Sequence, residues 1–142
     1  MRQVKHLLES KGHDVVTVGP SETVLEALQR MAEHGIGALV VMDGDRLAGL
    51  MSERDYARKV ILKSRHSVDT PVAEIMTAPV VTIAPDASVA ECMELCTSKR
   101  MRHLPVLENN RLVGLVSIGD LVKAIIDEQS EEIEHLQNYI AG

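Results

Sequence analysis

Residues 46–55, RLAGLMSERD, and residues 111–120, RLVGLVSIGD, are two copies of one segment, 65 residues apart. Arginine, leucine, glycine, leucine, serine and aspartate recur in the same order and at the same spacing. Working outward, residues 16–58 align with residues 81–123 without a gap, and 13 of the 43 aligned positions are identical. Because unrelated sequences agree at about one position in twenty, the chain contains an internal duplication.

Both copies predict the same order of secondary structure. A short β-branched run predicts a strand that ends near Pro20 or Pro85. Ser21 and Asp86 follow as expected helix N-caps, ahead of apolar residues at helical spacing. A hairpin and a second helix complete each copy, which gives the order β-α-β-β-α twice. The predicted strands are residues 15–18, 38–42 and 47–51 in the first copy and residues 80–83, 104–107 and 112–116 in the second.

This order predicts a mixed α/β (α+β) fold in which the two repeats pack sheet to sheet with pseudo-twofold symmetry, flanked by N- and C-terminal helices. One repeat alone has too small a core to be secure, so the two are expected to share a core. Clefts at the junction of repeated units are expected ligand sites. The expected boundaries are 1–65 for the first repeat with its N-terminal helix, 66–127 for the second repeat and 128–142 for the C-terminal helix.

The composition excludes several classes of protein. The 142 residues are 45% hydrophobic, which argues against intrinsic disorder. The chain has no Phe, no Trp and a net charge of −6, so binding of nucleic acid by base stacking or phosphate contacts is not expected. No apolar run reaches the length of a transmembrane helix, and no membrane partner is expected.

The cysteines and histidines predict neither a disulfide framework nor a metal site. Cys92 and Cys96 are too few for a disulfide framework, and no signal peptide is visible, so a cytoplasmic location is expected. The six histidines form no zinc-binding spacing. No nucleophile has a recognisable acid–base partner, so we expect no catalytic residue and no enzymatic activity.

The duplicated R-L-x-G-L-x-S-x-x-D segment and the R-H-L-P-V segment at residues 102–106 resemble the tandem cystathionine-β-synthase (CBS) domain pair over nearly the whole chain. The resemblance implies a stand-alone regulatory module without a catalytic cofactor. It implies adenosine-containing ligands such as AMP, ADP, ATP, NAD or S-adenosylmethionine, and a disc-like homodimer that signals to an effector protein the sequence does not name. The alternative is a ligand-independent dimerisation or interaction module.

The S-x-x-D motifs at Ser52–Asp55 and Ser117–Asp120 have two compatible interpretations. The spacing is typical of a helix capping box, with serine as the N-cap and an acid in the first turn. The resemblance adds a functional role, because a carboxylate at that place can accept hydrogen bonds from both ribose hydroxyls. The free N–H groups of the helix N-terminus also favour a phosphate.

The other site residues are implied by the resemblance. With no Phe or Trp in the chain, the adenine is expected between aliphatic residues, with its edge read by the backbone. Arg102 and His103 match phosphate-contacting positions, whereas the first repeat has Gly37 and Ala38 there, so the two clefts are not equivalent. The predicted ligand-binding residues are Thr17, Val18, Ile36, Gly37, Ala38, Ser52, Arg54, Asp55, Arg58, Thr77, Val81, Thr82, Met101, Arg102, His103, Pro105, Ser117 and Asp120.

One apolar stripe runs along the C-terminal helix, through Ile126, Ile133, Leu136 and Ile140, with acidic residues beside it. It is expected to pack on the module or on a dimer mate rather than on a membrane.

Overall fold

The computed structural model describes residues 2–141 and divides into two compact units. The first-repeat unit contains residues 14–81 and 109–113. The second-repeat unit contains, among the described residues, 2–13, 82–108 and 114–141. Each unit has its own small sheet and its own helices, which confirms the predicted mixed α/β fold with terminal helices.

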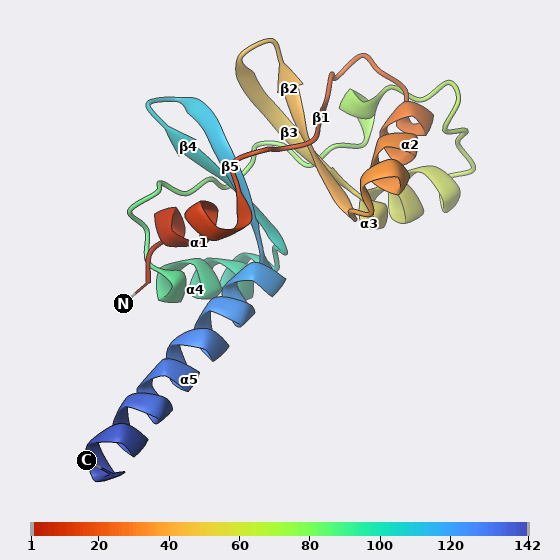
Figure 1. Cartoon of the computed structure of the whole chain (residues 1–142). Coiled ribbons are helices and arrows are strands. Elements are labelled where there is room, and N and C mark those ends of the chain that lie inside the picture. Colours follow the sequence, from red (N-terminus) through yellow and green to blue (C-terminus); the bar gives the residue numbers. More distant parts are fainter. Residues whose placement is uncertain (1, 142) are drawn as a thin grey trace. The chain divides into compact units, whose positions relative to one another are not determined.

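The first-repeat unit is built on a three-stranded sheet of order β1-β2-β3 (Figure 1). β1 pairs in parallel with β2, which pairs antiparallel with β3 in a register that sets Ala38 opposite Ser52. The core lies between this sheet and α2, and its fully buried side chains include Val24, Leu39 and Met51. The elements are β1 (Thr17–Val18), α2 (Val24–His34), β2 (Ala38–Asp43), β3 (Arg46–Ser52), α3 (Glu53–Tyr56), a π-helix η1 (Ala57–Ile61) and a 3-10 helix η2 (Val72–Glu74).

The second-repeat unit repeats this plan with a weaker first strand. Residues 80–83 do not form the predicted strand, and only Ile83 makes a parallel bridge, to Val106. In the first repeat Val40 N donates to Val16 O, but the equivalent of Val40 is Pro105, which has no N–H to donate. The elements are α1 (Val4–Lys11), α4 (Val89–Lys99), β4 (His103–Glu108), β5 (Arg111–Ser117) and α5 (Ile118–Ala141). Strand β5 belongs to this unit from Gly114 onward.

Three predicted helix boundaries are wrong. The N-caps of α2 and α4 are Thr23 and Ser88, whose side chains accept from Glu26 N and Glu91 N, rather than Ser21 and Asp86. The chain turns for two residues beyond the predicted caps before either helix begins. At the other end, no separate helix starts at residue 128, because α5 runs unbroken from Ile118 to Ala141. No Gly or Pro after Gly119 interrupts it before residue 142.

The segment that precedes each repeat packs on the sheet of the other repeat. Helix α1, which precedes the first repeat, belongs to the second-repeat unit, and residues 70–77, which precede the second repeat, belong to the first-repeat unit. The backbone bonds correspond: Val89 N donates to Arg2 O, and Val24 N donates to Thr70 O. The two donors are 65 residues apart in the sequence, and the two acceptors are 68 residues apart. The boundaries of the compact units therefore differ from those of the sequence repeats at α1 and at residues 70–77.

A glycine in each sheet makes room for these segments. A Cβ added at Gly114 would lie 2.5 Å from Leu8 Cδ2, and one at Gly49 would lie 2.7 Å from Met76 Sδ. Gly49 and Gly114 are equivalent in the 65-residue alignment, and Leu8 and Met76 are equivalent in the 68-residue one. The glycine of the duplicated segment thus serves close packing in both units.

Candidate functional site

Asp55 is the central residue of the candidate site in the first-repeat unit, and it lies in the first turn of α3, directly after β3. Its Oδ2 accepts hydrogen bonds from Ser52 N at 3.0 Å and Ser52 Oγ at 3.1 Å, and its own N–H donates to Ser52 Oγ at 3.2 Å. This is the predicted capping box, and it holds the carboxylate against the first turn of the helix. The Asp55 side chain is only 12% exposed.

The other oxygen of Asp55 faces groups from two further segments. Thr77 Oγ1 lies 3.4 Å from Oδ1, and Lys59 Nζ lies 3.2 Å from the same atom. Lys59 also donates to Ile75 O at 2.9 Å. A bridge in which Thr77 N donates to Leu50 O at 2.7 Å, and Leu50 N to Thr77 O at 3.0 Å, brings Thr77 to β3. Asp55 is thus an almost buried carboxylate with one ammonium counter-ion.

The strands place other predicted residues near this carboxylate. Ala38 is the register partner of Ser52, and Gly37 O accepts from Glu53 N at 3.0 Å. Thr17 and Val18 lie on the neighbouring strand β1, opposite Val40 and Val41.

Three further predicted residues of this repeat are placed less closely. Ile36 is half-buried and packs against the core of the unit. Arg54 and Arg58 are exposed, and Lys59 rather than either arginine pairs with Asp55.

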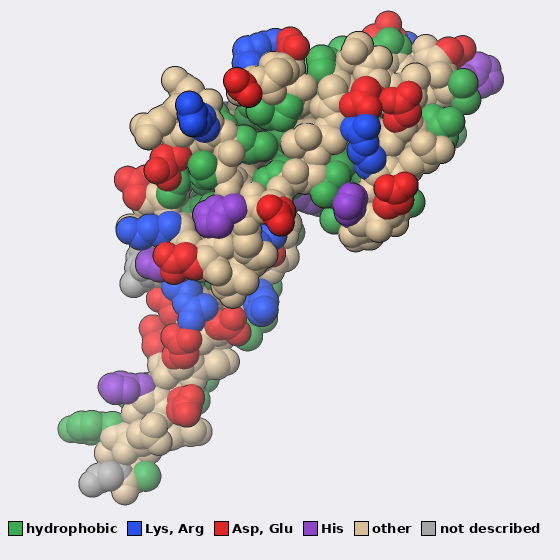
Figure 2. Space-filling model, turned by 45° about the horizontal axis from the view of Figure 1, so that its top comes forward, with side chains coloured by type: hydrophobic (Ala, Val, Ile, Leu, Met, Phe, Trp, Pro, Cys, Tyr) green, Lys and Arg blue, Asp and Glu red, His purple; other side chains and the backbone are tan. Residues whose placement is uncertain are grey.

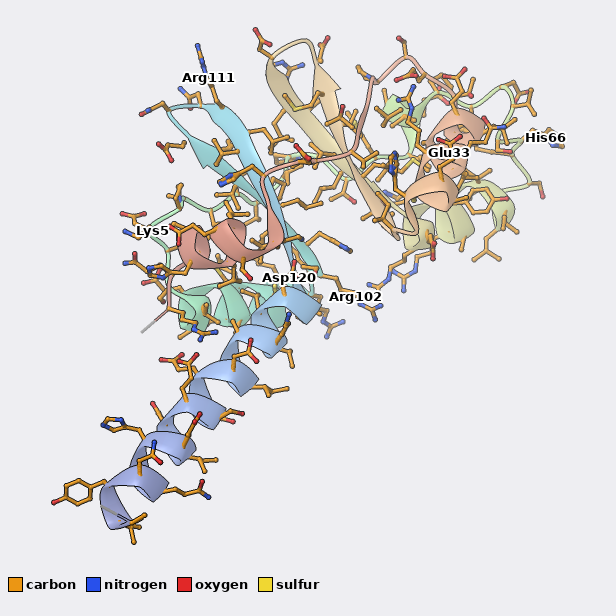
Figure 3. All side chains as sticks on the ribbon, viewed as in Figure 1. Lys5, Glu33, His66, Arg102, Arg111 and Asp120 are labelled. Atoms are coloured by element: carbon orange, nitrogen blue, oxygen red, sulfur yellow. The ribbon has the colours of Figure 1, made fainter. Side chains whose placement is uncertain are left out.

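Asp120 occupies the equivalent place at the first turn of α5 (Figure 3). Its Oδ2 accepts from Ser117 N at 2.8 Å, and its N–H donates to Ser117 Oγ at 3.1 Å. Lys11, at the end of α1, donates to the same Oδ2 at 2.6 Å and to Leu115 O at 2.8 Å. The Asp120 side chain is 27% exposed, so this carboxylate is more accessible than Asp55.

The electrostatics of this second site are set by burial and by Lys11. Burial raises the pKa of Asp120, but the hydrogen bonds from Lys11 and Ser117 outweigh it, and the net pKa is lowered. The pKa of His103 is also lowered, because burial and the nearby Lys11 charge outweigh the attraction of Asp120. His103 therefore enters the site as a neutral imidazole near pH 7.

Arg102 and His103 enter β4 beside the start of α5. Ile118 N donates to Arg102 O at 2.9 Å, which brings the Arg102 backbone to the first turn that carries Asp120. Figure 3 shows the labelled Arg102 and Asp120 at this end of α5. The Arg102 side chain is exposed, whereas His103 is half-buried.

The remaining predicted residues lie at the edges of the second site or in the core. Met101 follows α4, and its N–H donates to Cys96 O. Val81 and Thr82 precede the bridge at Ile83 and are half-buried. Pro105 is buried, and its carbonyl oxygen accepts from Ile83 N.

A groove of about 710 Å³ lies between α1 and the first half of α5. Both members of the Lys11–Asp120 pair line it, together with residues such as His6, Lys123 and Asp127. The groove is therefore of mixed charge, with Asp120 in its wall.

Other kinds of site are not found in the described part of the chain. Within residues 2–141 no three His, Cys, Asp or Glu side chains are grouped to hold a metal ion. None of the helices so described is long and apolar enough to cross a membrane. Cys92 and Cys96 are buried free thiols, and burial raises the pKa of Cys92 to about 11.

Two site residues were missed by sequence reasoning. Lys59 follows Asp55 by four residues, and this helical spacing of opposite charges was a usable signal. Lys11 lies 109 residues before Asp120 in the sequence, and nothing local connects the two.

Comparison with known proteins identifies the repeats. The CBS domain model matches residues 4–62 and 72–127. A mitochondrial CBS domain-containing protein of Arabidopsis thaliana is 42% identical over 126 residues, which cover 85% of this chain and 61% of that protein.

Solved structures agree with this match. A protein with CBS domains from Burkholderia ambifaria is 51% identical, with a TM-score of 0.86, over 90% of this chain and 96% of that one. A CBS domain pair solved with 5′-methylthioadenosine and S-adenosylmethionine shares the fold at 22% identity, with a TM-score of 0.79, over 90% of this chain and 98% of that one.

Proposed function

The chain belongs to the CBS domain family, and from that premise we propose that each repeat binds an adenosine-containing ligand of the AMP, ADP, ATP or NAD class. CBS domain pairs are regulatory, ligand-binding modules. The bound state would be passed on through a homodimer or an effector protein. The ligands of the solved pair, methylthioadenosine and S-adenosylmethionine, both contain adenosine and support this ligand class.

One observation carries the proposal: both repeats present an aspartate in a capping box at the start of a helix. The backbone N–H of Ser52 or Ser117 donates to one carboxylate oxygen, and the serine hydroxyl accepts from the N–H of the same aspartate. A carboxylate held in this way is preorganised to accept hydrogen bonds from vicinal ribose hydroxyls. Hydrogen bonds to a charged group contribute about 1.5–3 kcal/mol each, enough to anchor a nucleoside.

The lysines beside the two aspartates favour a ligand that carries phosphate. Lys59 and Lys11 neutralise Asp55 and Asp120 in the absence of ligand. If ribose hydroxyls take the place of the lysine ammonium on the carboxylate, the lysine is left as an unpaired cation next to the helix N-terminus. That arrangement attracts an anion, so we expect a nucleotide to bind more tightly than adenosine.

The same lysines also favour the alternative of a ligand-independent interaction module. In that case each aspartate serves only as a cap and an ion-pair partner, and added nucleotide changes nothing. The function proposed here is regulatory in both cases, rather than catalytic.

A cytoplasmic or other reducing compartment is part of the proposal. Cys92 and Cys96 are buried free thiols, which supports such a compartment.

The test is the thermal unfolding of the chain with AMP, ADP, ATP, NAD, S-adenosylmethionine or adenosine. A ligand in about hundredfold excess over its Kd stabilises the folded state by ~2.7 kcal/mol. In a chain of this size that corresponds to a rise in Tm of about 8–10 °C.

Asp55→Ala and Asp120→Ala should each remove the binding at one repeat, measured by calorimetric titration. Both substitutions also remove the carboxylate half of a capping box, so Thr23→Ala and Ser88→Ala, which weaken another helix start, serve as matched controls. Each control removes an N-cap from the same unit as the variant it matches, away from the aspartate. Equal loss of binding in variants and controls, or no Tm shift with any of the six compounds, would contradict the proposal.

A further inference from the structure

The C-terminal half of α5 buries no side chain in its own unit, although Glu131 at its beginning forms an ion pair with Arg2. Beyond residue 128 every described residue of this helix is exposed, and Figure 1 shows this part extending away from α1 and α4. The side chains that pack on the unit are Leu121 and Ala124, at the start of the helix. The exposed half is about a dozen residues long, and a helical segment of that length without tertiary packing is marginal in water.

The exposed face of the helix carries apolar residues at heptad spacing. Val122, Ile126, Ile133, Leu136 and Ile140 are 41–83% exposed, large and aliphatic. If Ile126 is position a, then Ile133 and Ile140 are also a, and Val122 and Leu136 are d. Gln129 takes the remaining d position. The a/d seam covers residues 122–140, about 28 Å of helix.

We propose that α5 pairs with α5 of a second copy of this chain in a parallel two-stranded coiled coil. Isoleucine at a with leucine at d favours two parallel strands. Gln129 is a polar residue on the seam, which lowers the stability of the pair but favours a register in which it meets another polar group. In the parallel arrangement the two Gln129 amides meet each other, so each can satisfy the other's hydrogen-bonding groups.

The charges of α5 are compatible with a parallel pair of α5 helices. Asp127, Glu128, Glu131 and Glu134 take positions b, c and f, away from the seam, and Figure 2 shows acidic side chains along the helix. Glu132, at g, faces the uncharged Gln137 at e of a parallel partner. An antiparallel pair sets Glu132 near its own copy and buries Gln129 against Ile133, which disfavours that arrangement.

The same acidic residues argue against a membrane as the occupant. A surface helix that binds anionic lipid carries lysine and arginine on its polar face. Between residues 124 and 141 this helix carries five acidic residues and no lysine or arginine.

Cysteine cross-linking tests the orientation directly in the full chain. In the parallel pair Leu136→Cys lies beside its own copy, so mild oxidation should give a disulfide-linked dimer at least about tenfold faster than Asn138→Cys. Asn138 lies two residues away, at position f, on the opposite face. Cys92 and Cys96 are buried and are present in both variants and in the unsubstituted chain, which gives the background rate. Equal rates for the two variants would overturn the proposal.

Sedimentation equilibrium tests the association itself. Ile133→Asp should weaken dimerisation by at least about tenfold, because it places a carboxylate on the seam. His135→Asp adds the same charge within the same turn, at position c, and should leave the dissociation constant within about threefold. Both residues are exposed in the single chain, so neither change should alter its folding. A monomeric unsubstituted chain without specific cross-linking would refute pairing with a second copy and direct the search to another partner.

Discussion

Substitution of Gly49 by alanine tests whether the segment before the second repeat is pressed against the first sheet. The added Cβ would lie 2.7 Å from Met76 Sδ and 2.9 Å from Thr77 O. The Met76 side chain can rotate away, but the Thr77 carbonyl is held by the 3.0 Å bond from Leu50 N. The backbone of residues 76–77 therefore has to shift.

The magnitude follows from two opposing effects. Overpacking costs ~1–3 kcal/mol, and a rigid backbone atom as the neighbour places Gly49→Ala in the upper half of that range. Removal of a strand glycine regains ~0.5–1 kcal/mol. We expect a net loss of about 2 kcal/mol, or about 6–8 °C in Tm.

Urea denaturation, with the m-value checked for constancy, is the assay. Gly19→Ala is the matched control, because its Cβ would meet the Glu22 side chain at ordinary distances of 3.5 Å or more and its φ is not positive. That control should be neutral or stabilising by up to ~1 kcal/mol. The loss of stability for Gly114→Ala should lie between those of Gly49→Ala and Gly19→Ala. The atoms nearest to its Cβ belong to the Leu8 side chain, which can move more easily than a backbone carbonyl. A loss below about 0.5 kcal/mol for Gly49→Ala, or an equal loss for Gly19→Ala, would refute the reasoning.

Three further predictions concern α1 and the charged pairs. Leu8→Ala should cost ~2–4 kcal/mol in urea unfolding, because Leu8 is 1% exposed beneath Gly114, and a cost under about 1 kcal/mol would contradict that packing. Lys11→Met should cost only ~0.5–1 kcal/mol at pH 7, since both partners are partly exposed, and the difference should shrink as pH falls below 3.8 and Asp120 becomes protonated. The hydrogen bond from Arg30 lowers the pKa of Glu22 to about 2, so its contribution to stability is present above pH 4.5 and is lost as pH falls toward 2. Glu22→Gln should therefore be less stable than the unsubstituted chain at pH 7 and converge with it over that interval, and parallel acid-unfolding curves would contradict the assignment.

Much of the fold could be predicted from local patterns. The hairpins β2–β3 and β4–β5 were expected because apolar runs flank short polar turns, and their observed bounds extend the predicted ones by a residue or two. The capping boxes at Ser52 and Ser117 were predictable because their hydrogen bonds join residues three apart. The absence of a strand at residues 80–83 could also have been predicted. Val40 N donates to Val16 O in the first repeat, and the equivalent residue in the second repeat is Pro105, which has no N–H.

The candidate site was only partly predictable. The aspartates follow from the repeated motif, but Lys11 reaches Asp120 only because α1 packs on the second-repeat unit. Arg54 and Arg58 were predicted near Asp55, but both are exposed, and Lys59 makes the contact. Lys59 follows Asp55 by four residues, a helical spacing that turns its ammonium toward the carboxylate, whereas Arg54 and Arg58 are at −1 and +3.

The sequence by itself therefore determined the duplicated unit, the order of its elements and the aspartate at the start of each second helix, since all of these depend on residues close together in the chain. Only the tertiary structure decided which segment covers each sheet and which lysine neutralises each aspartate. Those choices depend on contacts between residues far apart in sequence, such as Leu8 with Gly114 and Lys11 with Asp120, for which no local pattern selects the partner.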